Sequence, residues 1–227
     1  MNPGMENNSV VANTERYRAL VPDGVELVAV SKFHPAEAIL EAYGAGQRRF
    51  GESRVQELLA KEEVLPKDIE WHFIGHLQTN KVRQIIGRTA LIESVDSERL
   101  LRLIDSESKK AGVVTRVLMQ LHVAKEETKF GMTPEEMLAF FSEVRYRTLE
   151  ATHICGLMGM ASNTDDTERV RRDFADIAGC FRKIRETATD LVGFDHLSMG
   201  MSGDWQIAVS EGSNMVRIGT AIFGSRY

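Results

Sequence analysis

Short runs of β-branched and other apolar residues alternate with longer segments of helical periodicity along nearly the whole chain. This alternation is the strongest constraint on the fold, because strands that alternate with helices form parallel βαβ units with right-handed crossovers. The predicted strands span residues 25–32, 49–52, 70–75, 91–95, 115–123, 154–160, 196–201 and 215–220. Eight such units favour a closed (β/α)8 TIM barrel, an α/β fold, over the alternative of an open doubly wound sheet.

Several predicted helices have recognisable ends. Thr133 precedes a proline and stands three residues before Glu136, a pattern that predicts a capping box and a helix from residue 134. The longest helix is predicted to begin near residues 164–166. Residues 13–20 form a predicted helix outside or under the barrel. Pro35 opens the helix after the first strand, and its predicted apolar face consists of Ile39, Leu40 and Tyr43.

The composition indicates an ordinary globular protein. The net charge is −5 and the basic residues are scattered among acids, so no basic stripe points to nucleic acid. No apolar run approaches the ~20 residues of a membrane helix. The isolated Cys155 and Cys180 suit a reducing cytosol. We expect one soluble, cytoplasmic, monomeric domain over residues 1–227, with residues 1–24 as an N-terminal helical extension.

Lys32 closes the first predicted strand. Alternation places it on the same face as Val28 and Val30, and the reactive groups of such barrels lie at the carboxyl ends of the strands. If that face points inward, burial disfavours the ammonium form and leaves a neutral amine that can attack an aldehyde. The alternative is a lysine that caps the strand and reaches solvent. The weaker candidates, after a helix start or in a charged loop, are Lys81, Lys125 and Lys129.

Turns rich in small residues follow the last two predicted strands, at residues 197–203 (LSMGMSG) and 216–221 (VRIGTA). Barrels of this class often hold a phosphate in these two loops. Glycine permits close backbone approach, and the amides and hydroxyls are donors to an anion. Barrel closure would make both loops neighbours of Lys32. The alternative is that the glycines only form tight turns.

Arg217 lies two residues before Gly219 and is predicted to share its inward face. A buried arginine needs an acceptor, and a ring nitrogen of a bound heterocycle is one choice. An ion pair with Glu52 or Glu93 is the structural alternative. No carboxylate cluster accompanies the histidines of the chain, so we predict no metal site.

A set of short sequence motifs occurs in a fixed order along the chain. They are VSK at 30–32, FGE at 50–52 with VQE at 55–57, WHFIGHLQTNK at 71–81, KFG at 129–131, GLM at 156–158, LSMGMS at 197–202 and VRIGTAIFG at 216–224. In this order they closely resemble the pyridoxal phosphate homeostasis protein family. The resemblance runs from about residue 25 to the C-terminus.

The resemblance implies a barrel of the alanine-racemase N-terminal-domain type (fold type III), without a second domain, that binds pyridoxal 5′-phosphate (PLP). It places a Schiff base on Lys32, phosphate contacts around Ser198, Gly219 and Thr220, and Arg217 opposite the pyridine nitrogen. The predicted cofactor-binding residues, with no catalytic residue among them, are Lys32, Ser53, Met158, Ser198, Gly200, Arg217, Gly219 and Thr220.

Two positions depart from the family pattern. Many members have Asn-Tyr where this chain has Ser53-Arg54, so the contact of the asparagine is either made by Ser53 or lost. His122 stands at a strand end where many members carry a residue such as asparagine. Met158 flanks a glycine, and its position alone favours packing.

The expected site favours binding over turnover. An aspartate beside the pyridine nitrogen favours the protonated ring that stabilises carbanions, whereas a charged guanidinium opposes that protonation. Racemisation also needs acid/base groups on both faces of the ring, and Lys32 supplies one. We therefore expect a non-catalytic protein of vitamin B6 metabolism that binds, stores or delivers PLP, with PLP-dependent apo-enzymes as recipients. The alternatives are an amino-acid racemase and a cofactor-free Schiff-base aldolase.

Overall fold

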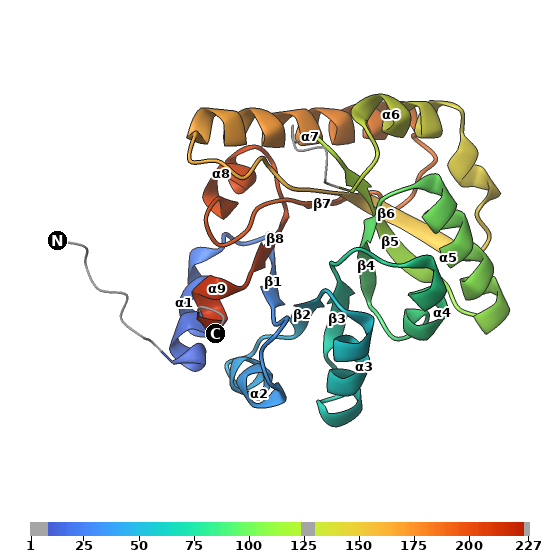
Figure 1. The fold of residues 1–227 in the computed structure, drawn as a ribbon. Coiled ribbons are helices and arrows are strands. Elements are labelled where there is room, and N and C mark those ends of the chain that lie inside the picture. Colours follow the sequence, from blue (N-terminus) through green and yellow to red (C-terminus); the bar gives the residue numbers. More distant parts are fainter. Residues whose placement is uncertain (1–8, 124–129, 225–227) are drawn as a thin grey trace.

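The computed structural model describes residues 9–123 and 130–224, and its strands form a closed parallel barrel (Figure 1). Each strand pairs with the next along the chain, and the last strand pairs with the first. The closed ring confirms the predicted (β/α)8 barrel and rules out the open sheet. The strands are β1 (Glu26–Val30), β2 (Arg49–Glu52), β3 (Glu70–Phe73), β4 (Leu91–Val95), β5 (Thr115–Leu121), β6 (Thr152–Gly159), β7 (His196–Ser198) and β8 (Met215–Ile218).

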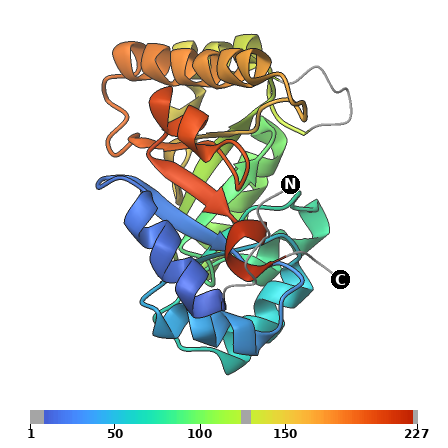
Figure 2. The same cartoon turned by 90° about the vertical axis from the view of Figure 1, so that its left-hand side faces the viewer.

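Helices follow the strands and cover the outside of the barrel (Figures 1 and 2). They are α2 (Ala36–Gly44), α3 (Val55–Val64), α4 (Val82–Ile85), α5 (Glu98–Ala111), α6 (Pro134–Ser142), α7 (Thr167–Thr187), α8 (Trp205–Ser210) and α9 (Thr220–Phe223), with short 3-10 turns at η1 (Thr79–Lys81) and η2 (Arg145–Thr148). In the part of the chain that the structure describes, no helix is both long and apolar enough to cross a membrane.

The helix signals in the sequence are confirmed in most respects. The Thr133 hydroxyl accepts from Glu136 N at 3.2 Å, and the Glu136 carboxylate accepts from Thr133 N at 2.9 Å, which completes the capping box. The apolar face predicted for α2 is wrong at Leu40, which is 45% exposed. Ile39 is buried as predicted, and Ala42 is buried in place of Leu40. Three residues apart, they share a face, and Leu40 is turned about 100° from Ile39 around the helix axis.

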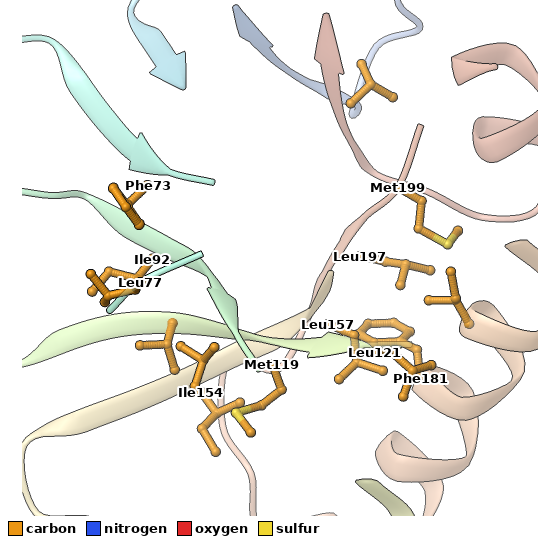
Figure 3. Packing of buried hydrophobic residues seen from close by; sticks show 14 of the residues in the cluster. Phe73, Leu77, Ile92, Met119, Leu121, Ile154, Leu157, Phe181, Leu197 and Met199 are labelled. Carbon is orange, nitrogen blue, oxygen red and sulfur yellow. The ribbon is translucent and has the colours of Figure 1, made fainter. Parts of the chain in front are cut away.

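The apolar residues form two separate clusters. The larger one fills the space between the strands and the surrounding helices (Figure 3). The smaller one contains Val28, Leu91, Leu118, Cys155, Met158 and Met215, which come from five different strands. Leu27 and Ala29 belong to the larger cluster while Val28 belongs to the smaller one, so β1 alternates between an outer and an inner face.

The N-terminal helix α1 (Val10–Leu20) lies outside the barrel against α2 and α9 (Figure 2). Its Asn13 side-chain amide donates to Ile222 O of α9 at 3.1 Å. This side-chain bond joins the described start of the chain to its last helix. The lysine candidates Lys125 and Lys129 lie outside the described residues.

Candidate functional site

Lys32 lies two residues after the end of β1, in the turn that leads into α2, and is half-buried. A Cβ atom added to Gly51 of β2 would lie 3.2 Å from Val28 Cγ1 and 3.6 Å from Val30 Cγ2, so these three residues share the inner face. Ser31, on the opposite face, donates its hydroxyl to Glu52 Oε1 at 2.6 Å. Alternation therefore continues to the end of β1 and supports an inward-facing Lys32 at the carboxyl end of the barrel.

The turn after β7 is built closely around Gly200. This buried glycine has φ +91°, and an added Cβ would lie 2.7 Å from Ala208 Cβ and 2.8 Å from Trp205 Cα of α8. No side chain fits there, and a left-handed φ favours glycine. Gly200 O accepts from Arg217 N at 3.0 Å, which ties this turn to β8.

The turn after β8 packs against β1. An added Cβ on Gly219 would lie 3.2 Å from both Cβ and O of Val30. Gly219 N donates to the Ser202 hydroxyl at 3.2 Å, so the two predicted phosphate loops are joined directly. Thr220 begins α9 and is exposed. The structure thus confirms that the two loops and the strand carrying Lys32 are neighbours.

Ser198 and Ser202 occupy different environments. Ser198 is fully buried, donates to Glu93 Oε2 at 2.6 Å and accepts from Arg217 Nη1. The Ser198 hydroxyl therefore bonds to Glu93 and Arg217 inside the barrel, and its role as a phosphate donor stays a prediction. Sequence reasoning passed over Ser202, the hydroxyl that stands at Gly219. Its place two residues after Gly200 in the LSMGMS string was the available signal.

Glu93 of β4 organises a polar layer across the barrel. Its carboxylate contacts His72 Nδ1 of β3 at 2.7 Å and Arg217 Nη1 at 3.6 Å, in addition to Ser198. Burial by itself would raise the pKa of Glu93, but the His72 hydrogen bond and then the charges of His72 and Arg217 outweigh it and lower the pKa. The buried carboxyl is thereby held as an anion.

Arg217 is buried and points into the barrel, as predicted. Its Nη2 donates to Gly159 O at 3.0 Å, and its ion-pair partner is Glu93. Of the two carboxylates that the sequence left open, Glu52 belongs to a different cluster outside the barrel wall. A contact between Arg217 and a ring nitrogen stays a prediction.

A buried charge cluster lies beneath the turn that carries Lys32, and sequence reasoning did not identify it. Lys61 Nζ of α3 donates to Glu52 Oε1 at 2.7 Å, to Glu57 Oε1 at 2.7 Å and to Ser31 O at 2.9 Å. Burial raises the pKa of Glu52, although the Lys61 charge and hydrogen bond and the Ser31 hydroxyl act against that rise. The i, i+4 spacing of Glu57 and Lys61 was the only local signal.

Ser53 and Met158 are the remaining residues that the sequence predicts to contact the cofactor. The Ser53 carbonyl lies against Gly75, where an added Cβ would overlap it, so the loops after β2 and β3 are packed together. Met158 is 2% exposed and belongs to the inner apolar cluster. Packing is thus its observed role, and cofactor contact by either residue stays a prediction.

Known proteins are similar to this chain in sequence and in fold. Residues 6–227 match the model of the alanine racemase N-terminal domain. The pyridoxal phosphate homeostasis protein of Schizosaccharomyces pombe is 41% identical over 207 residues, which cover 89% of this chain and 84% of that protein. Alanine racemase of E. faecalis, 18% identical with a TM-score of 0.73, shares the fold over 96% of this chain and 58% of its own.

PipY of Synechococcus elongatus PCC7942, solved with PLP bound, is also similar. It is 36% identical with a TM-score of 0.87, and the match covers 95% of this chain and all of PipY. The same protein without PLP gives a TM-score of 0.89. With these identities over nearly the full length, the chain belongs to the pyridoxal phosphate homeostasis protein family.

Proposed function

We propose that this protein binds PLP through a Schiff base on Lys32 and stores or delivers it as part of vitamin B6 homeostasis. The observation that carries the proposal is the packing of Gly219 onto Val30, which brings the turn predicted to form an anion cradle beside the strand that leads to Lys32. A phosphorylated aldehyde is the ligand that an amine and an anion cradle together would bind. PLP binding by PipY supports the choice.

The residues present fit the cofactor. Gly200 and Gly219 hold the two predicted phosphate turns close against Ala208 and Val30, and Ser202 and Thr220 add hydroxyl donors to the predicted phosphate set. Arg217 would face the ring, with Ser53, Met158 and Ser198 as the remaining predicted contacts. When bound, PLP supplies an aldehyde for capture and an electron-accepting ring.

We infer that turnover is negligible. Glu93 and Arg217 form a buried ion pair, so the residue assigned to the ring nitrogen is a permanent cation. The curated relatives carry the name of homeostasis proteins. Solvent deuterium entering the Cα position of added L-alanine is expected no faster than with free PLP at the same concentration. Faster entry would establish a racemase-type activity.

The first test is an absorption spectrum after addition of PLP, followed by borohydride reduction and peptide mass mapping. A visible Schiff-base band and a pyridoxyl adduct on the Lys32 peptide are expected. Absence of the band, with cleavage or condensation of sugar phosphates by the colourless protein, would favour the aldolase alternative. An adduct on Lys81 would mean that the assignment of the Schiff base to Lys32 is wrong.

Substitution of the two serines separates their roles. Ser202→Ala is expected to weaken PLP affinity by about 10- to 100-fold, because a hydrogen bond to a charged group contributes about 1.5–3 kcal/mol. Ser198→Ala is expected to lower stability by about 1–3 kcal/mol instead, since Glu93 loses a buried donor. Equilibrium PLP titration and urea unfolding measure the two effects. If Ser198→Ala weakened PLP affinity and Ser202→Ala lowered stability instead, Ser198 would be the phosphate contact.

The remaining proposals concern organisation. We propose that residues 1–227 act as one monomeric domain with residues 1–24 as its extension, and that apo-enzymes receive PLP from it. The two described cysteines are free and buried, which suits a cytoplasmic location. Light scattering of the purified protein tests the monomer, and transfer of PLP to an apo-enzyme in the presence of a PLP trap tests delivery.

A further inference from the structure

We infer that the buried cluster of Glu52, Glu57 and Lys61 is a positioning device that sets the direction of Lys32 toward the barrel mouth. The inference rests on the proposed function, because it concerns the lysine that would capture the cofactor. Glu57 and Lys61 act through the backbone of the turn that contains Lys32.

The cluster holds the backbone on both sides of Lys32. On one side, Ser31 O accepts from Lys61 Nζ at 2.9 Å. On the other side, Phe33 N donates to Glu57 Oε1 at 2.5 Å. The same Glu57 oxygen accepts from Lys61 Nζ, so one ion pair closes a bridge around the residue between them.

The turn needs such support because Phe33 has φ +68°. A left-handed conformation is unfavourable for a residue with a side chain, and it persists where the surroundings impose it. The hydrogen bond from Phe33 N to a carboxylate is charge-assisted and therefore strong. Arg54 also lies over the exposed Phe33 ring, at 4.7 Å from its centroid.

Burial makes the device rigid. Lys61 and Glu52 are 8% and 0% exposed in their side chains, and Glu57 is 19% exposed. Ser31 adds a third fixed contact through its hydroxyl on Glu52. Glu52 lies on the regular strand β2, and Glu57 and Lys61 lie on the regular helix α3. Their contacts therefore hold the irregular turn after β1 in a fixed position relative to these two elements.

Orientation affects the rate of capture. Neutral Nζ of Lys32 adds to the aldehyde carbon, a C=N bond forms, and the aldehyde oxygen leaves as water. An amine held in a reactive direction reacts faster than one that must search for it. The cluster is therefore expected to influence the rate of Schiff-base formation more than the stability of the fold.

Three variants of α3 test the inference. Glu57→Ala removes the acceptor for Phe33 N but leaves the Lys61–Glu52 pair intact. Glu57→Gln keeps an oxygen that can accept from both Phe33 N and Lys61 Nζ. Glu63→Ala is the matched control, an exposed glutamate on the same helix. The readout is the rate constant of appearance of the Schiff-base band after rapid mixing with PLP, followed by mapping of the reduced adduct.

Glu57→Ala is expected to slow this rate about tenfold with the adduct still on Lys32. Glu63→Ala is expected to react within about twofold of the unmodified protein, and Glu57→Gln, which keeps the oxygen acceptor but loses the charge, is expected to react at a rate between those of Glu57→Ala and Glu63→Ala. The inference is overturned if Glu57→Ala reacts as fast as Glu63→Ala, or if Glu57→Gln is as slow as Glu57→Ala. Failure of the proposed function is distinguishable, because the unmodified protein would then form no band.

Discussion

Replacement of Lys32 by alanine is expected to remove the Schiff-base band completely while the barrel stays folded. The Lys61 amine also lies near this turn, but it is held in an ion-paired cluster by Glu52 and Glu57, and the phosphate loops alone would leave only reversible binding of PLP. Lys32 lies outside both apolar clusters. A substitution away from such packing changes stability by at most about 0.5 kcal/mol, which shifts the melting temperature by about 2 °C.

The measurement is the difference spectrum of Lys32→Ala with and without PLP, together with mass mapping after borohydride. Lys81→Ala is the matched control, because Lys81 was a competing lysine and lies in η1. It is expected to keep the full band. A band in Lys32→Ala, or its loss in Lys81→Ala, would contradict the assignment.

The largest loss of stability is expected from Lys61→Ala. This change leaves Glu52 buried without its cation, and removal of one partner of a buried pair costs about 3–5 kcal/mol. Chemical unfolding at pH 7 measures the loss. A double variant, Glu52→Gln with Lys61→Met, removes both charges and is expected to recover most of the stability. No recovery would mean that packing of the Lys61 stem is the main contribution.

The Lys61→Ala loss is also expected to depend on pH. Burial already raises the pKa of Glu52, and without Lys61 the largest opposing influence disappears while the Ser31 hydrogen bond remains. A carboxyl with a raised folded-state pKa stabilises the fold below its unfolded-state pKa, and that stability is lost as pH rises through the folded-state value. Unfolding at a series of pH values should therefore show the smallest loss in acid. A loss independent of pH would contradict this origin.

The sequence predicts the barrel well because its signals are local and repeated. Most strands appear as short runs rich in apolar residues, although β2 (RFGE) has only one large apolar residue, and the capping box at Thr133 identifies its helix from four consecutive residues. Leu40 was misplaced because adjacent apolar residues do not specify how far a helix is rotated against the sheet. That rotation depends on packing against β-strands elsewhere in the chain.

The site was only partly predictable for a related reason. Lys32 is identified by its place at a strand end, which is a local property. For Arg217 the sequence offers Glu52 and Glu93 as ion-pair partners but does not decide between them, because Glu93 lies 124 positions earlier and becomes a neighbour only through barrel closure. The contact of Lys61 with Ser31 O was not predictable for another reason. Its acceptor is a backbone carbonyl, which every residue has, so the residue type at position 31 does not indicate the contact.

The pairing of β1 with β8 has a consequence for the order of events in synthesis. Lys32 is synthesised before Gly219, which lies 187 positions later in the chain. Because the two sides of the proposed site meet where β1 pairs with β8, a growing chain has no complete cofactor site until β8 is in place. A ligand that binds only the closed ring raises its stability by mass action. The amount of intact barrel would then follow the amount of available PLP.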